Sequence, residues 1–152
     1  MQGELVSINV SDGGVPKLPR QRAAIRMTGV DGDRQANRQI HGGPSRAVCL
    51  YSLDLIAALQ SEGHPIAPGT IGENFTISGV PWGSLTPGVW VDVGEVSLEL
   101  TDYANPCRNI AGSFLNRDMR RVSVRLYPEW SRLYARVVKE GTVTVGDPVI
   151  VR

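Results

Sequence analysis

The feature that most constrains this fold is the way glycine and proline divide the sequence into short apolar runs. The 17 glycines and 10 prolines are spread through all 152 residues, and the runs between them alternate in polarity or carry β-branched residues. This pattern is typical of short strands joined by turns. The clearest run is VSLELT, in which Val96, Leu98 and Leu100 would share one face of a strand. Strands are expected at residues 4–10, 23–27, 47–51, 74–77, 89–93, 96–101, 134–139 and 149–151.

Helical signals are fewer than strand signals. The run SLDLIAALQSEG predicts one helix, with Ser52 as its N-cap and Gly63 as its stop. The C-terminal run RVVKEGTVTVGDPVIVR is expected to form a hairpin that turns at residues 140–141, with a second turn at residues 146–147. Many strands with few short helices predict a mainly β fold, either a barrel or a strongly bent sheet. In the helix predicted from SLDLIAALQSEG, the apolar stripe is expected to be Leu55, Ile56 and Leu59.

The stretch TDYANPCRNI, residues 101–110, breaks at Asn105-Pro106 and places Cys107 directly after the break. A second helix is expected here, with Pro106 in its first turn. A thiol at such a turn faces exposed backbone N–H groups, which favour the thiolate, and Arg108 would add positive charge. The other interpretation is that Cys107 is a small buried hydrophobic residue, the usual position of a free cysteine. The buried side of this helix is expected to be Ile110, Phe114 and Leu115.

Residues 30–52, VDGDRQANRQIHGGPSRAVCLYS, form a long polar segment before a buried strand. Loops of this length inside a domain are often functional. Gly42 and Gly43 would let the backbone approach a ligand closely, and Arg46 offers a planar fork for phosphate or carboxylate. The alternative is a simple tight turn, with Arg46 solvated at the start of the strand. The charged or titratable candidates are Asp33, Arg34, Arg38, His41 and Arg46.

A second candidate segment is GTIGENFTISG, residues 69–79, which places Glu73 and Asn74 just before a strand. Both could face a cleft near a barrel rim, or Asn74 could only satisfy a turn. Cys49 lies in the continuous apolar run AVCLY and is expected in the core, without a functional role. The two histidines and two cysteines show no metal-ligand spacing, so no zinc site is expected.

Length, charge and cysteine content argue against several classes of protein. With 152 residues and no internal repeat or linker, the chain is expected to be a single domain, residues 1–152. A formal net charge of +1 provides no basic footprint for nucleic acid. No apolar run is long enough to cross a bilayer, and the N-terminus MQGELVSINV lacks an apolar signal core, so we expect a cytoplasmic protein. Two distant cysteines predict reduced thiols rather than a disulfide framework or an iron–sulfur cluster.

Three motifs occur in a fixed order: HGGPSRAV at residues 41–48, GENFT at residues 72–76, and LELT followed by a Pro-Cys pair that ends at Cys107. In this order and spacing they resemble the MOSC domain, named for the C-terminal domain of molybdenum cofactor sulfurase. SINVSDGGVPK near the start and SRLYARVVKEGTVTVGDPVIV at the end are similar to small stand-alone bacterial members. The resemblance therefore spans almost the whole chain.

The resemblance implies a strand-rich barrel of the pyruvate-kinase β-barrel type that binds the molybdenum cofactor. The family's signature cysteine, which is taken to ligate molybdenum or to carry sulfur, matches Cys107. Pyridoxal phosphate binding is also attributed to the family. Larger members carry further domains that this sequence does not match, so the residues that those domains contribute cannot be mapped here. By residue matching, the cofactor-binding positions would be His41, Gly42, Gly43, Arg46, Glu73, Asn74 and Thr101, with Arg108 beside the cysteine.

Several MOSC proteins reduce N-hydroxylated compounds, including hydroxylaminopurine-type base analogues and amidoximes. The resemblance therefore implies a terminal reductase with Cys107 on molybdenum, and the absence of a flavin, nicotinamide or iron–sulfur motif predicts electrons from separate flavin or iron–sulfur proteins. Two alternatives stay open: a carrier of persulfide sulfur or of cofactor for other enzymes, and a cofactor-free binding module with a structural cysteine. Beyond a small-molecule substrate and the electron donor, neither nucleic acid nor membrane is expected as a partner. The oligomeric state stays open, with a homodimer as one option.

Overall fold

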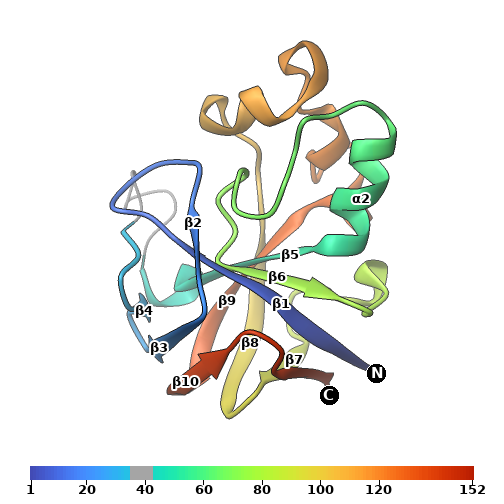
Figure 1. The fold of residues 1–152 in the computed structure, drawn as a ribbon. Coiled ribbons are helices and arrows are strands. Elements are labelled where there is room, and N and C mark those ends of the chain that lie inside the picture. Colours follow the sequence, from blue (N-terminus) through green and yellow to red (C-terminus); the bar gives the residue numbers. More distant parts are fainter. Residues whose placement is uncertain (35–42) are drawn as a thin grey trace.

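The structure is a computed structural model that describes residues 1–34 and 43–152. Within these residues, seven strands follow the order β11, β7, β8, β9, β5, β6, β1, and β1 also pairs with β11, which closes a barrel (Figure 1). Neighbouring strands are antiparallel except for β5 and β6, which are parallel. The mainly β barrel expected from the sequence is confirmed. The barrel strands are β1 (Gln2–Val10), β5 (Val48–Ser52), β6 (Phe75–Ser78), β7 (Trp90–Val93), β8 (Val96–Ala104), β9 (Arg132–Lys139) and β11 (Pro148–Val151).

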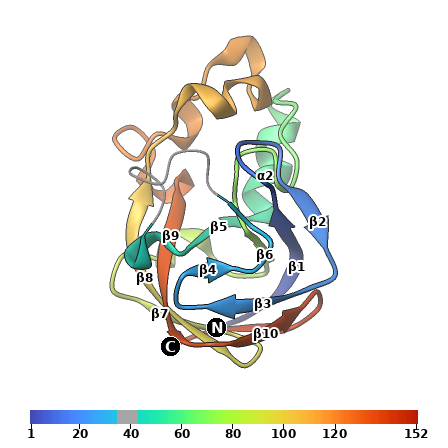
Figure 2. The same cartoon turned by 90° about the vertical axis from the view of Figure 1, so that its left-hand side faces the viewer.

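Further strands lie outside this ring. β2 (Leu18–Arg20) pairs with the end of β1, and a small sheet in the lower half of Figure 2 has the order β10 (Gly141–Thr144), β3 (Arg22–Arg26), β4 (Gly29–Val30). Each expected strand overlaps an observed one, whereas β2 and β4 were not predicted. The expected C-terminal hairpin is wrong, because β9 pairs with β5 and β8 while β10 pairs with β3. Turn residues show where the chain reverses, but they do not choose the neighbouring strand in a closed barrel.

The expected first helix is α2 (Leu53–Ser61), which lies at one side of the barrel (Figure 1). The Leu55 backbone N–H donates to the Ser52 Oγ over 3.1 Å, so the predicted N-cap is present. Ile56 and Leu59 of the apolar stripe are buried. The backbone turns left-handed at Gly63, with φ 100°, where only glycine is unstrained, and this residue ends the helix as predicted.

The second expected helix is only partly correct. The segment after β8 forms η3 (Arg108–Ser113), a six-residue 3₁₀ helix, and Cys107 precedes it in an extended conformation with φ −132° and ψ 169°. Pro106 therefore lies outside the helix. Ile110 and Phe114 are buried as predicted, but Leu115 is 50% exposed. The run Gly112-Ser113 has poor helix propensity, which explains why the helix ends before it becomes α-helical. The other short 3₁₀ helices are η1 (Pro44–Arg46), η2 (Trp82–Ser84), η4 (Leu115–Arg117), η5 (Arg120–Val122) and η6 (Pro128–Trp130).

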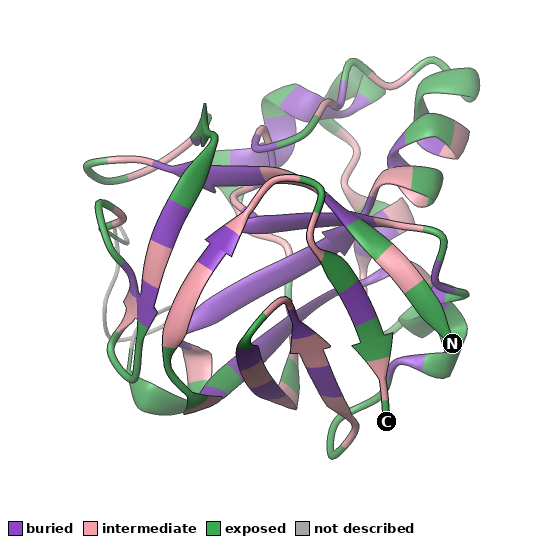
Figure 3. Cartoon of the chain, turned by 60° about the horizontal axis from the view of Figure 1, so that its bottom comes forward, coloured by how far each residue is buried: buried purple, intermediate pink, exposed green. Residues whose placement is uncertain are grey.

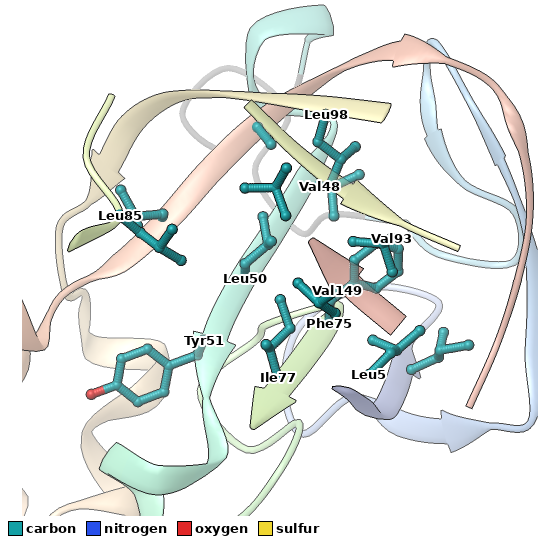
Figure 4. Close-up of a cluster of buried hydrophobic side chains, with 14 of the residues drawn as sticks. Leu5, Val48, Leu50, Tyr51, Phe75, Ile77, Leu85, Val93, Leu98 and Val149 are labelled. Atoms are coloured by element: carbon teal, nitrogen blue, oxygen red, sulfur yellow. The ribbon is translucent and has the colours of Figure 1, made fainter. Parts of the chain in front are cut away.

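The barrel interior is filled by side chains, which leaves no room for a pore. Buried and more exposed residues alternate along the strands (Figure 3), and in β8 Val96, Leu98 and Leu100 are buried as the period of two predicts. No helix in the described ranges is long and apolar enough to span a membrane. Figure 4 shows side chains from different strands that point toward one another in this core, including Leu5, Leu50, Phe75, Leu98 and Val149.

Candidate functional site

A cavity lies where the loop after β1, strands β5 and β9, and the segment after β8 meet. Its volume is about 60 Å³, or about 490 Å³ with the part open to solvent, so a ligand of the usual size, roughly 300–1,000 Å³, would also occupy the open part. Cys107 and Cys49 both line it, together with two cationic side chains and a tyrosine. The residues that matter for its chemistry are Lys17, Cys49, Cys107, Arg132 and Tyr134.

The cavity wall contains a buried guanidinium without a carboxylate partner. Arg132 is only 4% exposed, and it donates from Nη1 to the Ile71 carbonyl over 2.8 Å and from Nη2 to the Asn105 carbonyl over 3.2 Å. Its Nε has no hydrogen-bond partner, and no acid among residues 1–34 and 43–152 forms an ion pair with it. A buried cation of this kind is costly unless an anion compensates it. Arg132 is therefore suited to bind an anionic group in the cavity.

A second buried cation, Lys17, is held by an acid. Its Nζ lies 2.6 Å from the Asp33 Oδ2, and both side chains are 6% exposed. Asp33 also accepts from the Ser11 backbone N–H over 2.9 Å and from the Asn74 Nδ2 over 2.9 Å. Three donors thus converge on one carboxylate, which fixes the position of the ammonium at the cavity wall.

Asn74 is fully buried and does not line the cavity, so of the two alternatives left open by the sequence it does not take the cleft-facing one. Its Oδ1 accepts from the Cys49 backbone N–H over 3.0 Å, and its Nδ2 donates to the Asn9 carbonyl over 3.2 Å and to Asp33. The side chain therefore connects β1, β5 and the loop that carries Asp33. Its role in this structure is to position the wall of the cavity.

Glu73 is also fully buried rather than in the cleft. The Thr76 hydroxyl donates to Oε2 over 3.0 Å, whereas Oε1 has no partner in the described structure. Burial raises the pKa of the Glu73 carboxyl to about 7, and nearby hydrogen-bond donors and the Arg132 charge oppose the shift. Glu73 is thus a buried acid that titrates near neutral pH.

The predicted site residues near Gly43 are connected to β8 by hydrogen bonds. Thr101 lies at an irregularity in the pairing of β8 with β9, and its hydroxyl donates to the Ser45 carbonyl of η1. The Arg46 Nη2 donates to the Asp102 Oδ2 over 3.2 Å, and the Arg46 Cζ lies 5.0 Å from the centre of the Tyr134 ring. Thr101 and Arg46 therefore support the cavity through η1 and Tyr134. Gly43 precedes η1 with φ 91°, while His41 and Gly42 lie outside the described residues.

The two thiols differ in exposure. Cys107 is half-buried at the cavity, and its extended backbone before a short 3₁₀ helix removes the predicted argument from a helix N-terminus. Cys49 is 3% exposed, as predicted for a core residue, but its position on the cavity wall was not predicted. Burial raises the pKa of the Cys49 thiol to about 11, so this thiol stays protonated. Arg108 is exposed and does not line the cavity.

Lys17, Arg132 and Tyr134 were not recognised from the sequence as site residues. Lys17 is the last residue of the SINVSDGGVPK motif, and this motif was the sequence signal that could have identified it as a site residue. Burial raises the pKa of Tyr134 above its ordinary value, so its hydroxyl stays protonated and can donate. No group of three or more His, Cys, Asp or Glu side chains in the described part of the chain could hold a metal ion.

Comparison with known proteins places the chain in a family. The MOSC domain model matches residues 37–150. Uncharacterized protein YflK of Bacillus subtilis (strain 168) is 27% identical over 135 residues, which cover 88% of this chain and 60% of YflK. Protein YiiM of Escherichia coli (strain K12) is 28% identical over 83 residues, which cover 52% of this chain and 37% of YiiM, so the chain spans less than two thirds of either relative.

A solved structure agrees at the level of the fold. The crystal structure of YiiM from Geobacillus stearothermophilus superposes with a TM-score of 0.78 at 22% sequence identity, over 99% of this chain and 75% of that chain. A likeness at this identity concerns the fold alone. The family model, in contrast, covers well over half of the sequence and includes Cys107 and Arg132. The chain belongs to the MOSC domain family.

Proposed function

We propose that this chain binds the molybdenum cofactor in the cavity and is the cytoplasmic terminal reductase of N-hydroxylated compounds. Membership of the MOSC family supports cofactor binding in general. The observation that carries the proposal is that Cys107 and the buried guanidinium of Arg132, whose Nε has no partner among the described residues, share one cavity. A thiolate is a soft ligand suited to a transition metal, and a guanidinium fork suits a phosphate.

The residues present fit such a group. Cys107 would ligate the metal, and Arg132 with Lys17 would hold the anionic phosphate, which would add a negative charge beside the Arg132 guanidinium. When bound, the cofactor supplies a metal that exchanges two electrons. Cys49, which is 3% exposed, is the less accessible thiol of the two.

The overall reaction defines what the chain must provide. An N–OH compound takes up two electrons and two protons, its N–O bond breaks, and the products are an amine and water. The electrons would come from a separate protein that carries a reduced flavin or iron–sulfur cluster. The Tyr134 hydroxyl, protonated at the cavity wall, would donate a hydrogen bond to the substrate oxygen.

The test is metal analysis and pterin fluorescence on wild type, Cys107→Ser and Cys49→Ser from a host that makes the cofactor. We expect near-stoichiometric molybdenum and pterin in wild type, loss of molybdenum in Cys107→Ser, and retention in the Cys49→Ser control. Turnover of an amidoxime with chemically reduced methyl viologen should likewise be present in wild type and Cys49→Ser and lost in Cys107→Ser.

Other results lead to the alternatives. Bound pterin without turnover, combined with transfer of cofactor or sulfur to an acceptor enzyme, would favour a carrier. Neither metal nor pterin in wild type would favour a cofactor-free module and contradict the proposal.

A further inference from the structure

Two segments of this chain are strongly basic, residues 17–26 and residues 108–127, and the second lies beside the cavity. Residues 108–127 contain five arginines and one aspartate, a formal charge of +4. The whole chain carries +1, so the remaining residues sum to +1 − 4 = −3. The near-neutral total therefore conceals a marked charge asymmetry, which creates a local field that can steer a charged partner.

Several of these charges are not neutralised by neighbours. Arg120 pairs with Asp118 at 2.6 Å, and Arg121 pairs with Glu62 of α2 at 2.8 Å. Arg108, Arg117 and Arg125 are exposed, and the described residues provide no ion pair for any of them. Three arginines thus present unneutralised charge to solvent from one segment.

The same segment exposes apolar side chains. Leu115 and Leu126 are 50% and 51% exposed, and Tyr127 is 41% exposed. Together with the end of α2 they border a groove with a volume of about 970 Å³, including the part open to solvent. The Arg121 Cζ lies 4.7 Å from the centre of the Tyr127 ring and 4.2 Å from the centre of the Trp130 ring, which keeps these aromatic rings in place. We call the exposed residues Arg117, Arg125, Leu115, Leu126 and Tyr127 the basic face.

The segment that carries the basic face begins at the candidate site. The segment starts immediately after Cys107, and its first residues, Asn109 and Ile110, line the cavity. In Figure 1 this segment forms the upper end of the molecule, above the barrel and beside α2. A protein that bound here would lie next to the cavity that contains Cys107.

We propose that the basic face docks an acidic redox protein, a flavodoxin-type electron donor. This inference rests on the proposed reductase function, which needs two electrons for each N–O bond broken. Transient redox complexes have small interfaces, in which complementary charge raises the association rate and a small apolar centre provides contact. A reduced flavin that returned to the oxidised state would supply both electrons, and two protons would come from solvent.

The test compares two charge reversals of equal size. Arg117→Glu with Arg125→Glu changes the basic face, and Arg20→Glu with Arg22→Glu changes exposed residues of β2 and β3. The probe is an acidic flavodoxin, with its dissociation constant measured at low and high ionic strength. Salt screens exposed charges beyond a Debye length of about 10 Å at 0.1 M, so wild-type affinity should fall as salt increases. We expect the face variant to bind roughly tenfold more weakly at low salt and the control variant to bind like wild type.

Two independent measurements separate this inference from the proposed function. Turnover with reduced methyl viologen should be unchanged in the face variant, whereas turnover with reduced flavodoxin should fall with its affinity. If methyl viologen supports no turnover in wild type, the reductase function fails, and the binding assay still tests the docking face. Equal affinity of the face variant and wild type, equal weakening in the control, or binding of wild type to anionic vesicles or RNA but not to flavodoxin would each overturn the inference. Circular dichroism and thermal midpoints verify that both variants fold.

Discussion

Replacing Glu73 by glutamine should remove a pH dependence of stability that the wild type has. The Glu73 carboxyl is fully buried, its Oε1 has no partner among the described residues, and burial raises its pKa from 4.5 to about 7. A raised pKa means that the native state binds this proton more tightly than the unfolded chain does. The stabilising contribution is therefore complete below pH 4.5 and is lost as pH rises through about 7.

The size of this loss of stability follows from the pKa shift of Glu73. A change of about 2.5 pKa units corresponds to about 3 kcal/mol, since one unit is about 1.4 kcal/mol. Between pH 4.5 and pH 7.5, wild type should lose about 3 kcal/mol of unfolding free energy relative to Glu73→Gln. Glutamine fills a similar volume and has no proton to lose in this range.

The assay is urea denaturation at four pH values between 4.5 and 7.5, for wild type, Glu73→Gln and Glu4→Gln. Glu4 is an exposed carboxylate of β1, so its replacement should leave the pH profile as in wild type. All other titrating groups are common to the variants and cancel in the difference. If the difference in unfolding free energy between wild type and Glu73→Gln stayed constant across this pH range, the reasoning would be refuted. Glu73 would then have the same pKa in the native and unfolded states.

Three further substitutions test other parts of the structure. Arg132→Met should weaken retention of the cofactor phosphate by about 1.5–3 kcal/mol, measured as pterin left after gel filtration, and unchanged retention would remove Arg132 from the site. Ser52→Ala removes the acceptor of the Leu55 N–H and should cost about 1 kcal/mol in urea denaturation, clearly more than the exposed control Ser61→Ala. Phe75→Ala opens a cavity in a fully buried position and should cost about 3–5 kcal/mol, so a loss below 1 kcal/mol would contradict the packed core.

Local sequence signals predicted the elements better than their pairing. The alternation in residues 96–101 placed a strand correctly, because burial of one face depends only on neighbours along the chain. The partners of β10 and β11 depend on barrel closure between β1 and β11, which joins the two ends of the sequence. Such a contact leaves no periodic trace near either strand, so the expected hairpin was a reasonable but wrong local solution.

In the candidate site, too, local sequence signals did not predict which polar side chains are buried. Glu73 and Asn74 precede a strand, and polar residues at such a position usually face solvent or a cleft. Both are buried here because Asn74 satisfies groups on three separate segments: the Cys49 N–H, the Asn9 carbonyl and the Asp33 carboxylate. The motif could be recognised from the sequence, but its role as a support behind the cavity depends on contacts up to 65 residues apart.

Arg132 illustrates how a single long-range pairing creates the site. The strand expected from the sequence began at Tyr134, two residues after Arg132. In the structure β9 begins at Arg132, which pairs with Ala104 at the end of β8, where the chain leaves the barrel toward Cys107. The guanidinium then reaches the carbonyls of Ile71 and Asn105. Both Nη atoms donate to the backbone while Nε is buried with no partner among the described residues, so the side chain that lines the cavity also holds these two segments together.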